Sequence, residues 1–403
     1  MGLNDTPSGE RMHIGFFGKR NAGKSSVVNA VTGQELAVVS EEKGTTTDPV
    51  KKAMELLPIG PVLVIDTPGF DDVGSLGKKR VEKTREILRR TDVAVLVVDA
   101  EEGLSDSDRE MLALFEEREL PFLIVYNKSD LIKERPEEKE NEIYVSAKYK
   151  ENITELKEKI ARIGRHKGEE KPLARDLIRP KELAVLVIPI DSAAPKGRII
   201  LPQQQVLRDI LEADGAAICV KETELAATLE QLSTKPKIVI TDSQVFEQVA
   251  KDVPEDVLLT SFSILMARYK GFLETAVKGV AFMRHLKDGD KVLIAEGCTH
   301  HRQCDDIGTV KIPRWLRSYT KKNLEFVTCS GQEFPQDLSD YAMVIHCGAC
   351  MLNEKEVRFR MKSAVRQGVP VTNYGIAIAM MHGILKRGVE VFPEIHRLLE
   401  DDA

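Results

Sequence analysis

Residues 12–25 read MHIGFFGKRNAGKS, an apolar run that leads into a glycine-rich loop. The spacing from Gly18 through Gly23, Lys24 and Ser25 is that of a phosphate-binding P-loop, which requires a strand before it and a helix after it. Backbone N–H groups and the helix N-terminus of such a loop cradle phosphate oxygens. We therefore expect Lys24 to reach the β- and γ-phosphates and Ser25 to ligate Mg²⁺.

A second motif ends the apolar run VLVIDTPG at residues 62–69. Asp66 is expected to hold the Mg²⁺ shell, and the Gly69 amide is expected to contact the γ-phosphate. Between this motif and the P-loop lies GTTTD (44–48), where a switch loop belongs. We predict that Thr46 closes on Mg²⁺ and the γ-phosphate, with Thr45 as the alternative.

Two later motifs predict that the base is guanine. Asn127-Lys128-Ser129-Asp130 ends another buried run, and a carboxylate such as Asp130 accepts the N1–H and N2–H₂ pair that adenine lacks. Ser146-Ala147 supplies a backbone amide for guanine O6. The residues expected to bind nucleotide are Asn21, Gly23, Lys24, Ser25, Ser26, Asn127, Lys128, Asp130, Ser146 and Ala147, and those expected to be catalytic are Lys24, Thr46, Asp66 and Gly69.

The chain has 403 residues, of which 42% are hydrophobic and 30% charged, as in a globular protein with several domains. Apolar runs alternate with amphipathic stretches, which predicts parallel sheets covered by helices. The fold class is therefore α/β with three domains. These are a Ras-like P-loop GTPase (1–167), a small α/β domain (175–262) and a third α/β domain (263–403). The charged segment 164–180 is expected to be a linker.

The second domain has four strand-like runs, at residues 183–191, 216–220, 236–241 and 256–261. An uncovered edge of such a small sheet favours pairing with a second copy, so we expect dimerisation here; a plain packing domain is the alternative. The third domain is expected to open with one long helix over 263–286.

Five of the six cysteines lie in the last third of the chain. Cys298-x-His300 and His346-Cys347-x-x-Cys350 each follow an expected strand, and strand ends are where sites form in α/β sheets. Three thiolates can hold three irons of a [4Fe–4S] cluster. Zinc in a Cys₂His₂ or Cys₃His site is the competing interpretation.

Over residues 10–165 the motifs resemble the translation-factor-like GTPases of the TrmE–Era group. Phe70 follows the Asp66–Gly69 motif, and a phenylalanine cannot orient water, so we expect unaided GTP hydrolysis to be slow. Asn21 occupies the P-loop position at which potassium-activated members of this group carry an asparagine. The resemblance therefore implies that K⁺ activates hydrolysis; an asparagine that only caps the loop is the alternative.

The joint pattern, a TrmE–Era-like GTPase with Cys298-x-His300 and His346-Cys347-x-x-Cys350, resembles the [FeFe]-hydrogenase maturation GTPases of the HydF family. The resemblance implies a [4Fe–4S] cluster on the three cysteines with one exchangeable site, for which His300, His346, Asp305 or water are candidate ligands. It also implies a scaffold or carrier for the diiron subcluster precursor and a homodimer formed through the middle domain. The implied partners are two radical-SAM maturases and apo-[FeFe]-hydrogenase.

The remaining expectations come from composition. The net charge of −6 and the lack of a long basic stretch argue against nucleic-acid binding. The sequence shows no signal peptide and no apolar run long enough to span a bilayer, so we expect a cytoplasmic protein without a membrane partner. The alternative function is a GTPase that acts on RNA or the ribosome and carries a C-terminal zinc module, with the basic stretch 311–322 contacting phosphate.

Overall fold

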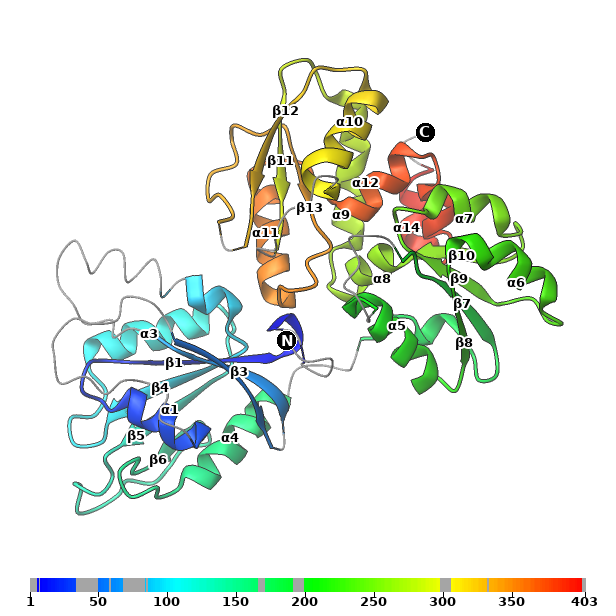
Figure 1. Ribbon diagram of the computed structural model, residues 1–403. Coiled ribbons are helices and arrows are strands. Elements are labelled where there is room, and N and C mark those ends of the chain that lie inside the picture. The colour runs from blue at the N-terminus through cyan, green and yellow to red at the C-terminus, as the bar shows by residue number, and fades with distance from the viewer. Residues whose placement is uncertain are drawn as a thin grey trace. The chain divides into compact units, whose positions relative to one another are not determined.

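The computed structural model describes residue 6 and residues 8–33, 50–57, 59–67, 84, 86–165, 171–190, 199–297, 306–331 and 333–400. The chain divides into two compact units, Met1–Glu169 and Glu170–Ala403 (Figure 1). Across the described ranges, helices that combine the length and the apolar character needed to cross a membrane are absent. The three-domain boundaries expected from the sequence stay a prediction.

The described part of the first unit contains a six-stranded sheet. Its strands, in their order across the sheet, are β2 (Val50–Leu56), β3 (Gly60–Asp66), β1 (Met12–Gly18), β4 (Val93–Asp99), β5 (Phe122–Asn127) and β6 (Glu142–Tyr144). Neighbouring strands are parallel except for the antiparallel pair β2 and β3. The strand that leads into the P-loop, β1, therefore lies inside the sheet and ends at the same edge as β4 and β5.

Helices cover both faces of this sheet, as the continuous apolar strands require. On one face α1 (Lys24–Thr32) and α4 (Ile153–Arg165) bury residues such as Val28 and Ile160. On the other face α3 (Asp106–Glu117) buries Met111 and Phe115. The predicted doubly covered α/β fold is confirmed for this unit.

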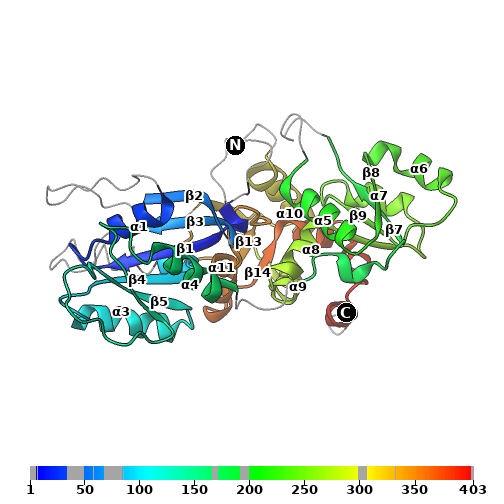
Figure 2. The same ribbon diagram turned by 90° about the horizontal axis from the view of Figure 1, so that it is seen from below.

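The described residues of the second unit contain two four-stranded parallel sheets (Figure 2). The first, in spatial order, is β10 (Leu258–Ser261), β9 (Ile238–Thr241), β7 (Leu183–Val187) and β8 (Ala216–Val220). The second is β12 (Glu325–Cys329), β11 (Lys291–Ala295), β13 (Met343–His346) and β14 (Val371–Asn373). One continuous hydrophobic core includes strands of both sheets. The α/β character expected for the second and third domains is confirmed.

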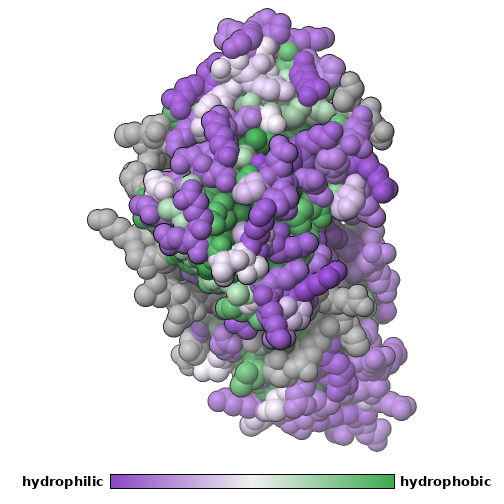
Figure 3. All heavy atoms as spheres, turned by 90° about the vertical axis from the view of Figure 1, so that its right-hand side faces the viewer, coloured by the Kyte–Doolittle hydropathy of each residue, from purple (hydrophilic) through white to green (hydrophobic). Residues whose placement is uncertain are grey.

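The α-helices described in this unit are α5 (Leu201–Glu212), α6 (Leu225–Gln231), α7 (Phe246–Asp252), α8 (Phe262–Tyr269), α9 (Leu273–Ala281), α10 (Ile312–Thr320), α11 (Glu354–Arg366), α12 (Tyr374–Met381), α13 (Leu385–Val389) and α14 (Pro393–Leu398). On the face in Figure 3, hydrophilic side chains predominate and hydrophobic side chains gather near the centre.

The long helix expected over residues 263–286 is in fact two helices, so that expectation is wrong. Gly271 has a φ of 72° and separates α8 from α9. The Phe272 N–H donates to the Ala267 carbonyl at 3.0 Å, a helix-ending bond that a glycine in this left-handed conformation permits. The apolar periodicity continues past the turn because both helices bury their apolar side against the same core.

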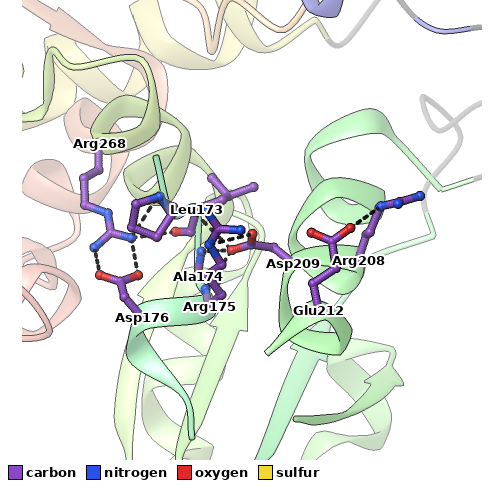
Figure 4. A network of polar contacts seen from close by, with 9 residues as sticks. Leu173, Ala174, Arg175, Asp176, Arg208, Asp209, Glu212 and Arg268 are labelled. Atoms are coloured by element: carbon purple, nitrogen blue, oxygen red, sulfur yellow. Dashed lines mark hydrogen bonds and ion pairs between the residues drawn. The ribbon is translucent and has the colours of Figure 1, made fainter. Parts of the chain in front are cut away.

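The second half of the segment expected to be a linker, 164–180, is packed into the second unit. Leu173 and Ala174 are buried. The Asp209 carboxylate on α5 accepts the backbone N–H groups of Leu173, Ala174 and Arg175 at 3.1, 2.6 and 2.7 Å (Figure 4). A single carboxylate therefore anchors the start of this unit, although the local sequence is charged and aperiodic.

Arg268 on α8 reinforces this anchor (Figure 4). Its guanidinium donates to both carboxylate oxygens of Asp176 at 2.7 Å and to the Leu173 carbonyl at 3.0 Å. Burial alone would raise the pKa of Asp176, but the hydrogen bond and positive charge of Arg268 outweigh it and lower that pKa. The segment is thus held through both its backbone and its side chains.

We predict that Asp209→Ala lowers the free energy of unfolding of the second unit by about 2–3 kcal/mol, because three N–H groups lose a charged acceptor. Urea unfolding followed by the fluorescence of Trp315, the one tryptophan, measures this change. Glu212→Ala on the same helix removes an exposed ion pair with Arg208 and is the control, expected to cost about 0.5 kcal/mol or less. Equal effects of the two substitutions would contradict the anchor.

Candidate functional site

The P-loop closes against the strand end that carries Asn127. Gly23 lies at φ 79° and ψ 24°, and a Cβ at this position would lie 2.2 Å from Asn127 Nδ2. Asn127 Nδ2 donates to the Ala22 carbonyl at 3.0 Å, and Asn127 Oδ1 accepts the Ala147 N–H at 3.1 Å. One buried amide therefore joins the phosphate loop to the predicted base-binding motif, and a side chain at residue 23 would block it.

Three residues expected at the phosphate end come together. The register of β1 with β3 pairs Phe16 with Asp66, which places this carboxylate beside the start of the P-loop. Lys24 Nζ forms an ion pair with Asp66, and Ser25 Oγ donates to Asp66 Oδ2 at 3.0 Å. A Mg²⁺–phosphate group requires these three chemical groups. The ammonium pairs with phosphate, and the hydroxyl and the carboxylate hold Mg²⁺.

The residues expected to contact guanine line one cavity. It has a volume of about 690 Å³ and is bounded by Gly23, Ser26, Asn127, Lys128, Asp130, Ser146, Ala147 and other residues. Ser146 Oγ donates to Asp130 Oδ1 at 2.6 Å, which orients the carboxylate expected to read the base edge. The cavity therefore combines the predicted base-reading residues with the end of the P-loop.

One contact at this edge was missing from the sequence prediction. Lys128 Nζ lies 2.6 Å from Asp99 Oδ2, and Asp99 ends the neighbouring strand β4. The signal available in the sequence was an aspartate, Asp99, at the end of a buried apolar run. Thr46 and Gly69, the other two residues expected to be catalytic, lie outside the described residues, as do Thr45 and Phe70. Asn21 is exposed at φ 63°, a conformation that asparagine tolerates better than most residues.

A second candidate site lies where β11 and β13 end, in the second unit. Ala295 pairs with His346 in the parallel register, so the chain leaves both strands at the same edge. The Cys347 N–H donates to the Ala295 carbonyl at 2.8 Å, which extends the pairing by one residue. The cysteine motif at 347–350 therefore begins beside Gly297, the last described residue before Cys298.

The Cys347 sulfur is surrounded by backbone donors. The N–H groups of Gly297 and Ala349 lie 3.0 and 3.3 Å from Sγ. Burial raises the pKa of the Cys347 thiol to about 11, against the lowering effect of these two hydrogen bonds. The thiol therefore stays protonated at neutral pH unless a cation stabilises the thiolate, and the two N–H groups already provide part of that stabilisation.

The turn between the two cysteines is held by a buried ammonium group. Lys270 is 5% exposed, and its Nζ donates to the carbonyls of Ala349 and Leu352. Ala349 has a φ of 55°, so the turn takes a conformation that a residue with a Cβ rarely adopts. The ammonium group therefore holds the turn by hydrogen bonds to two of its carbonyls.

His346 is fully buried and faces α11. Its Nε2 lies 3.2 Å from Arg360 Nη1, and its Nδ1 lies 2.9 Å from the Cys347 carbonyl. Burial, helped by the charge of Arg360, lowers the pKa of His346 to about 3. The ring is therefore neutral at physiological pH.

The structure brings Cys347 and Cys350 to one turn, but Cys298, His300, Cys304 and Asp305 lie outside the described residues. Within the described part of the chain, a group of three or more His, Cys, Asp or Glu side chains able to hold a metal ion is absent. The predicted ligand set of Cys298, Cys347 and Cys350 stays a prediction. Lys270 and Arg360 were missed because neither belongs to a motif.

Three family models match consecutive parts of the chain. Residues 13–128 match a model described as 50S ribosome-binding GTPase. Residues 173–271 match the hydrogen maturase F dimerization domain, and residues 274–391 match the hydrogen maturase F tetramerization domain. The descriptions of the last two models indicate that the chain forms oligomers.

Curated relatives match the first unit. The tRNA modification GTPase MnmE of Dechloromonas aromatica is 37% identical over 175 residues, which are 41% of this chain and 38% of that protein. GTPase Der of Kosmotoga olearia is 36% identical over 134 residues, 32% of this chain and 30% of that protein. The matches thus span only about a third of the length of these relatives.

Solved structures show weaker likeness. A crystal structure of Era in complex with MgGDPNP and 16S ribosomal RNA matches at a TM-score of 0.35 and 20% identity, over 57% of this chain and 92% of that one. A probable GTP-binding protein engB matches at a TM-score of 0.32 and 24% identity, over 38% of this chain and 100% of that one. TM-scores below 0.5 do not establish a common fold, so the assignment depends on the family models.

The P-loop, the guanine-type cavity and the match over residues 13–128 define the class of the first unit: it is a Ras-like P-loop GTPase domain. The chain as a whole belongs to the hydrogen maturase F (HydF) family, because two domain models of that family match the chain after the GTPase domain. The resemblance to the HydF family that the sequence motifs indicated is confirmed.

We predict that Asp130→Asn weakens GDP binding by at least ~100-fold, because the amide cannot accept both guanine N–H groups. The same substitution should improve binding of xanthosine diphosphate, whose additional carbonyl can accept a hydrogen bond from the new amide. Isothermal titration with both nucleotides measures the exchange of preference. Asp106→Asn, an exposed position on α3, is the control. Unchanged GDP affinity in Asp130→Asn would remove this residue from the base site.

Proposed function

We propose that the protein is a GTP-hydrolysing iron–sulfur scaffold or carrier that assembles or delivers the diiron subcluster precursor to immature [FeFe]-hydrogenase. The observation that carries this proposal is the Cys347 sulfur, a partly buried thiol that accepts two backbone N–H groups at the end of a parallel sheet. Family membership supports the role in hydrogenase maturation. The location in the cytoplasm stays a prediction.

The cluster would be held by Cys298, Cys347 and Cys350. Three observations support the fit of the described residues. The Cys347 sulfur already has N–H donors, as cluster sulfurs commonly do. The buried Lys270 holds the turn by hydrogen bonds to two of its carbonyls. Gly297, which contacts Cys347, directly precedes Cys298 in the sequence. When bound, a [4Fe–4S] cluster with three cysteine ligands supplies one exchangeable iron site for the precursor.

The nucleotide site would bind GTP and Mg²⁺ through Lys24, Ser25 and Asp66. Lys24 neutralises charge on the β- and γ-phosphates, and Asp66 orients the Mg²⁺ shell. Hydrolysis would release the switch loops that contain Thr46 and Gly69 and so change the affinity for a partner protein. The proposed partners are two radical-SAM maturases and apo-[FeFe]-hydrogenase.

The proposed homodimer forms through the sheet that contains β8. This strand lies at an edge of its sheet, and Ala216 and Cys219 on it are exposed. Unpaired backbone groups of an edge strand are a template for pairing with another strand. The match of residues 173–271 to a dimerization-domain model supports dimerisation through this region.

We predict that K⁺ raises the rate of GTP hydrolysis at least ~10-fold over Na⁺, because a cation at Asn21 stabilises negative charge that develops on the phosphates. Asn21→Gly should abolish the difference between the two salts without backbone strain, since glycine accepts the positive φ of this position. Arg20→Gln, one residue away and also exposed, is the control. Equal rates of the parent protein in K⁺ and Na⁺ would rule out potassium activation.

We predict that anaerobic reconstitution gives a brown protein with ~4 iron per chain and a [4Fe–4S] EPR signal after reduction. Cys347→Ser should lose most of this iron and the ability to activate apo-hydrogenase, and it should keep GTP hydrolysis, because the P-loop lies in the other unit.

Light scattering of the same samples should give two chains per particle.

Cys219→Ser, on strand β8, is the control for iron content only and should keep its iron. A colourless protein that takes up one zinc per chain would contradict the iron–sulfur proposal and favour the zinc interpretation. Retention of the full iron content by Cys347→Ser would show that the cluster lies elsewhere.

A further inference from the structure

Arg360 on α11 is a fully buried arginine, and its two Nη atoms contact residues at or just after the carboxyl ends of β12 and β13. It is 1% exposed. Nε donates to Glu356 Oε1 at 2.9 Å, one turn earlier on the same helix, and Nη2 donates to the Gly331 carbonyl at 2.6 Å. The ring of Phe334 lies 5.1 Å from the guanidinium. These contacts fix the arginine in one orientation.

The remaining contact of Arg360 determines the state of His346. An arginine side chain has only donors, so the nitrogen that faces Nη1 at 3.2 Å, His346 Nε2, must be the acceptor. A neutral ring with an unprotonated Nε2 carries its proton on Nδ1. Nδ1 then donates to the Cys347 carbonyl at 2.9 Å, and both ring nitrogens have partners.

We propose that Arg360 is a positioning residue that acts on Cys347 through His346. The guanidinium holds the imidazole as the Nδ1–H tautomer, and the imidazole holds the Cys347 carbonyl and with it the start of the 347–350 turn. In this arrangement Arg360 occupies Nε2 and the Cys347 carbonyl occupies Nδ1. His346 therefore supports the cysteine turn through a hydrogen bond and is not a metal ligand. The inference deepens the proposed cluster site and rests on it in part.

The first test uses metal-free protein and therefore does not depend on the cluster. In ¹⁵N NMR of histidine-labelled protein, the signals of His346 are those lost in His346→Asn. We expect an unprotonated Nε2 and a protonated Nδ1. The double variant Glu356→Met with Arg360→Met removes both partners of the buried pair and so avoids an unpaired charge. It should shift the His346 Nε2 signal, because this nitrogen loses its hydrogen-bond donor.

Arg366→Met, an exposed position on the same helix, is the control and should leave the His346 signals unchanged. A protonated Nε2 in the parent protein would overturn the proposal. An unchanged Nε2 signal in the double variant would also overturn it, because the arginine would then have no influence on the ring.

The second test separates a supporting histidine from a ligand. Asparagine at position 346 retains a donor near the place of Nδ1, whereas leucine retains none. We expect His346→Asn to bind iron and give the EPR signal of the parent, and His346→Leu to bind iron ~10-fold to 100-fold more weakly, the range found when support of a ligand is removed. Equal loss in both variants would overturn the proposal, as would strong coupling of a histidine nitrogen to the cluster that disappears in His346→Asn. A parent protein without any cluster would defeat the proposed function, and the NMR test would still decide the role of Arg360.

Discussion

Neighbouring parallel strands end at the same edge of their sheet, and this constraint decides where both candidate sites lie. In the first unit it brings the loop after β1, Asp66 at the end of β3 and Asn127 at the end of β5 to one edge. In the second unit it brings Gly297, after β11, to Cys347, after β13. Residues 50 positions apart thereby touch, although nothing in the local sequence joins them.

Buried polar side chains then fix the loops that leave these edges. Asn127 joins the P-loop to Ala147, and Lys270 and Arg360 hold the cysteine turn and His346. Each of these groups is satisfied by hydrogen bonds, which is the condition under which burial of a polar or charged group is tolerated. Both loops are therefore held in place by the folded chain itself, so little ordering is required when a ligand binds.

The two sites lie in separate compact units, and each unit has its own hydrophobic core. A substitution at the candidate metal site should therefore leave nucleotide binding intact, and a substitution at the nucleotide site should leave the candidate metal site intact. A GTP-dependent change in the second unit would have to act through a partner protein or through the placement of the units, because the hydrogen bonds within each site are local to it.

The class of the first unit could be predicted without a structure, because the P-loop, Asp66–Gly69 and Asn127–Asp130 spacings are imposed by the geometry of a nucleotide on strand ends. The sequence also predicted the parallel α/β character of the rest and marked the cysteines, because apolar runs and soft ligands are local signals. Only the folded chain shows the break at Gly271, the packing of Leu173 and Ala174, and the contacts of Lys270 and Arg360. These depend on contacts between residues tens of positions apart, such as Lys270 with Leu352, and hydrophobic periodicity carries no information about which distant carbonyl or carboxylate a buried side chain meets.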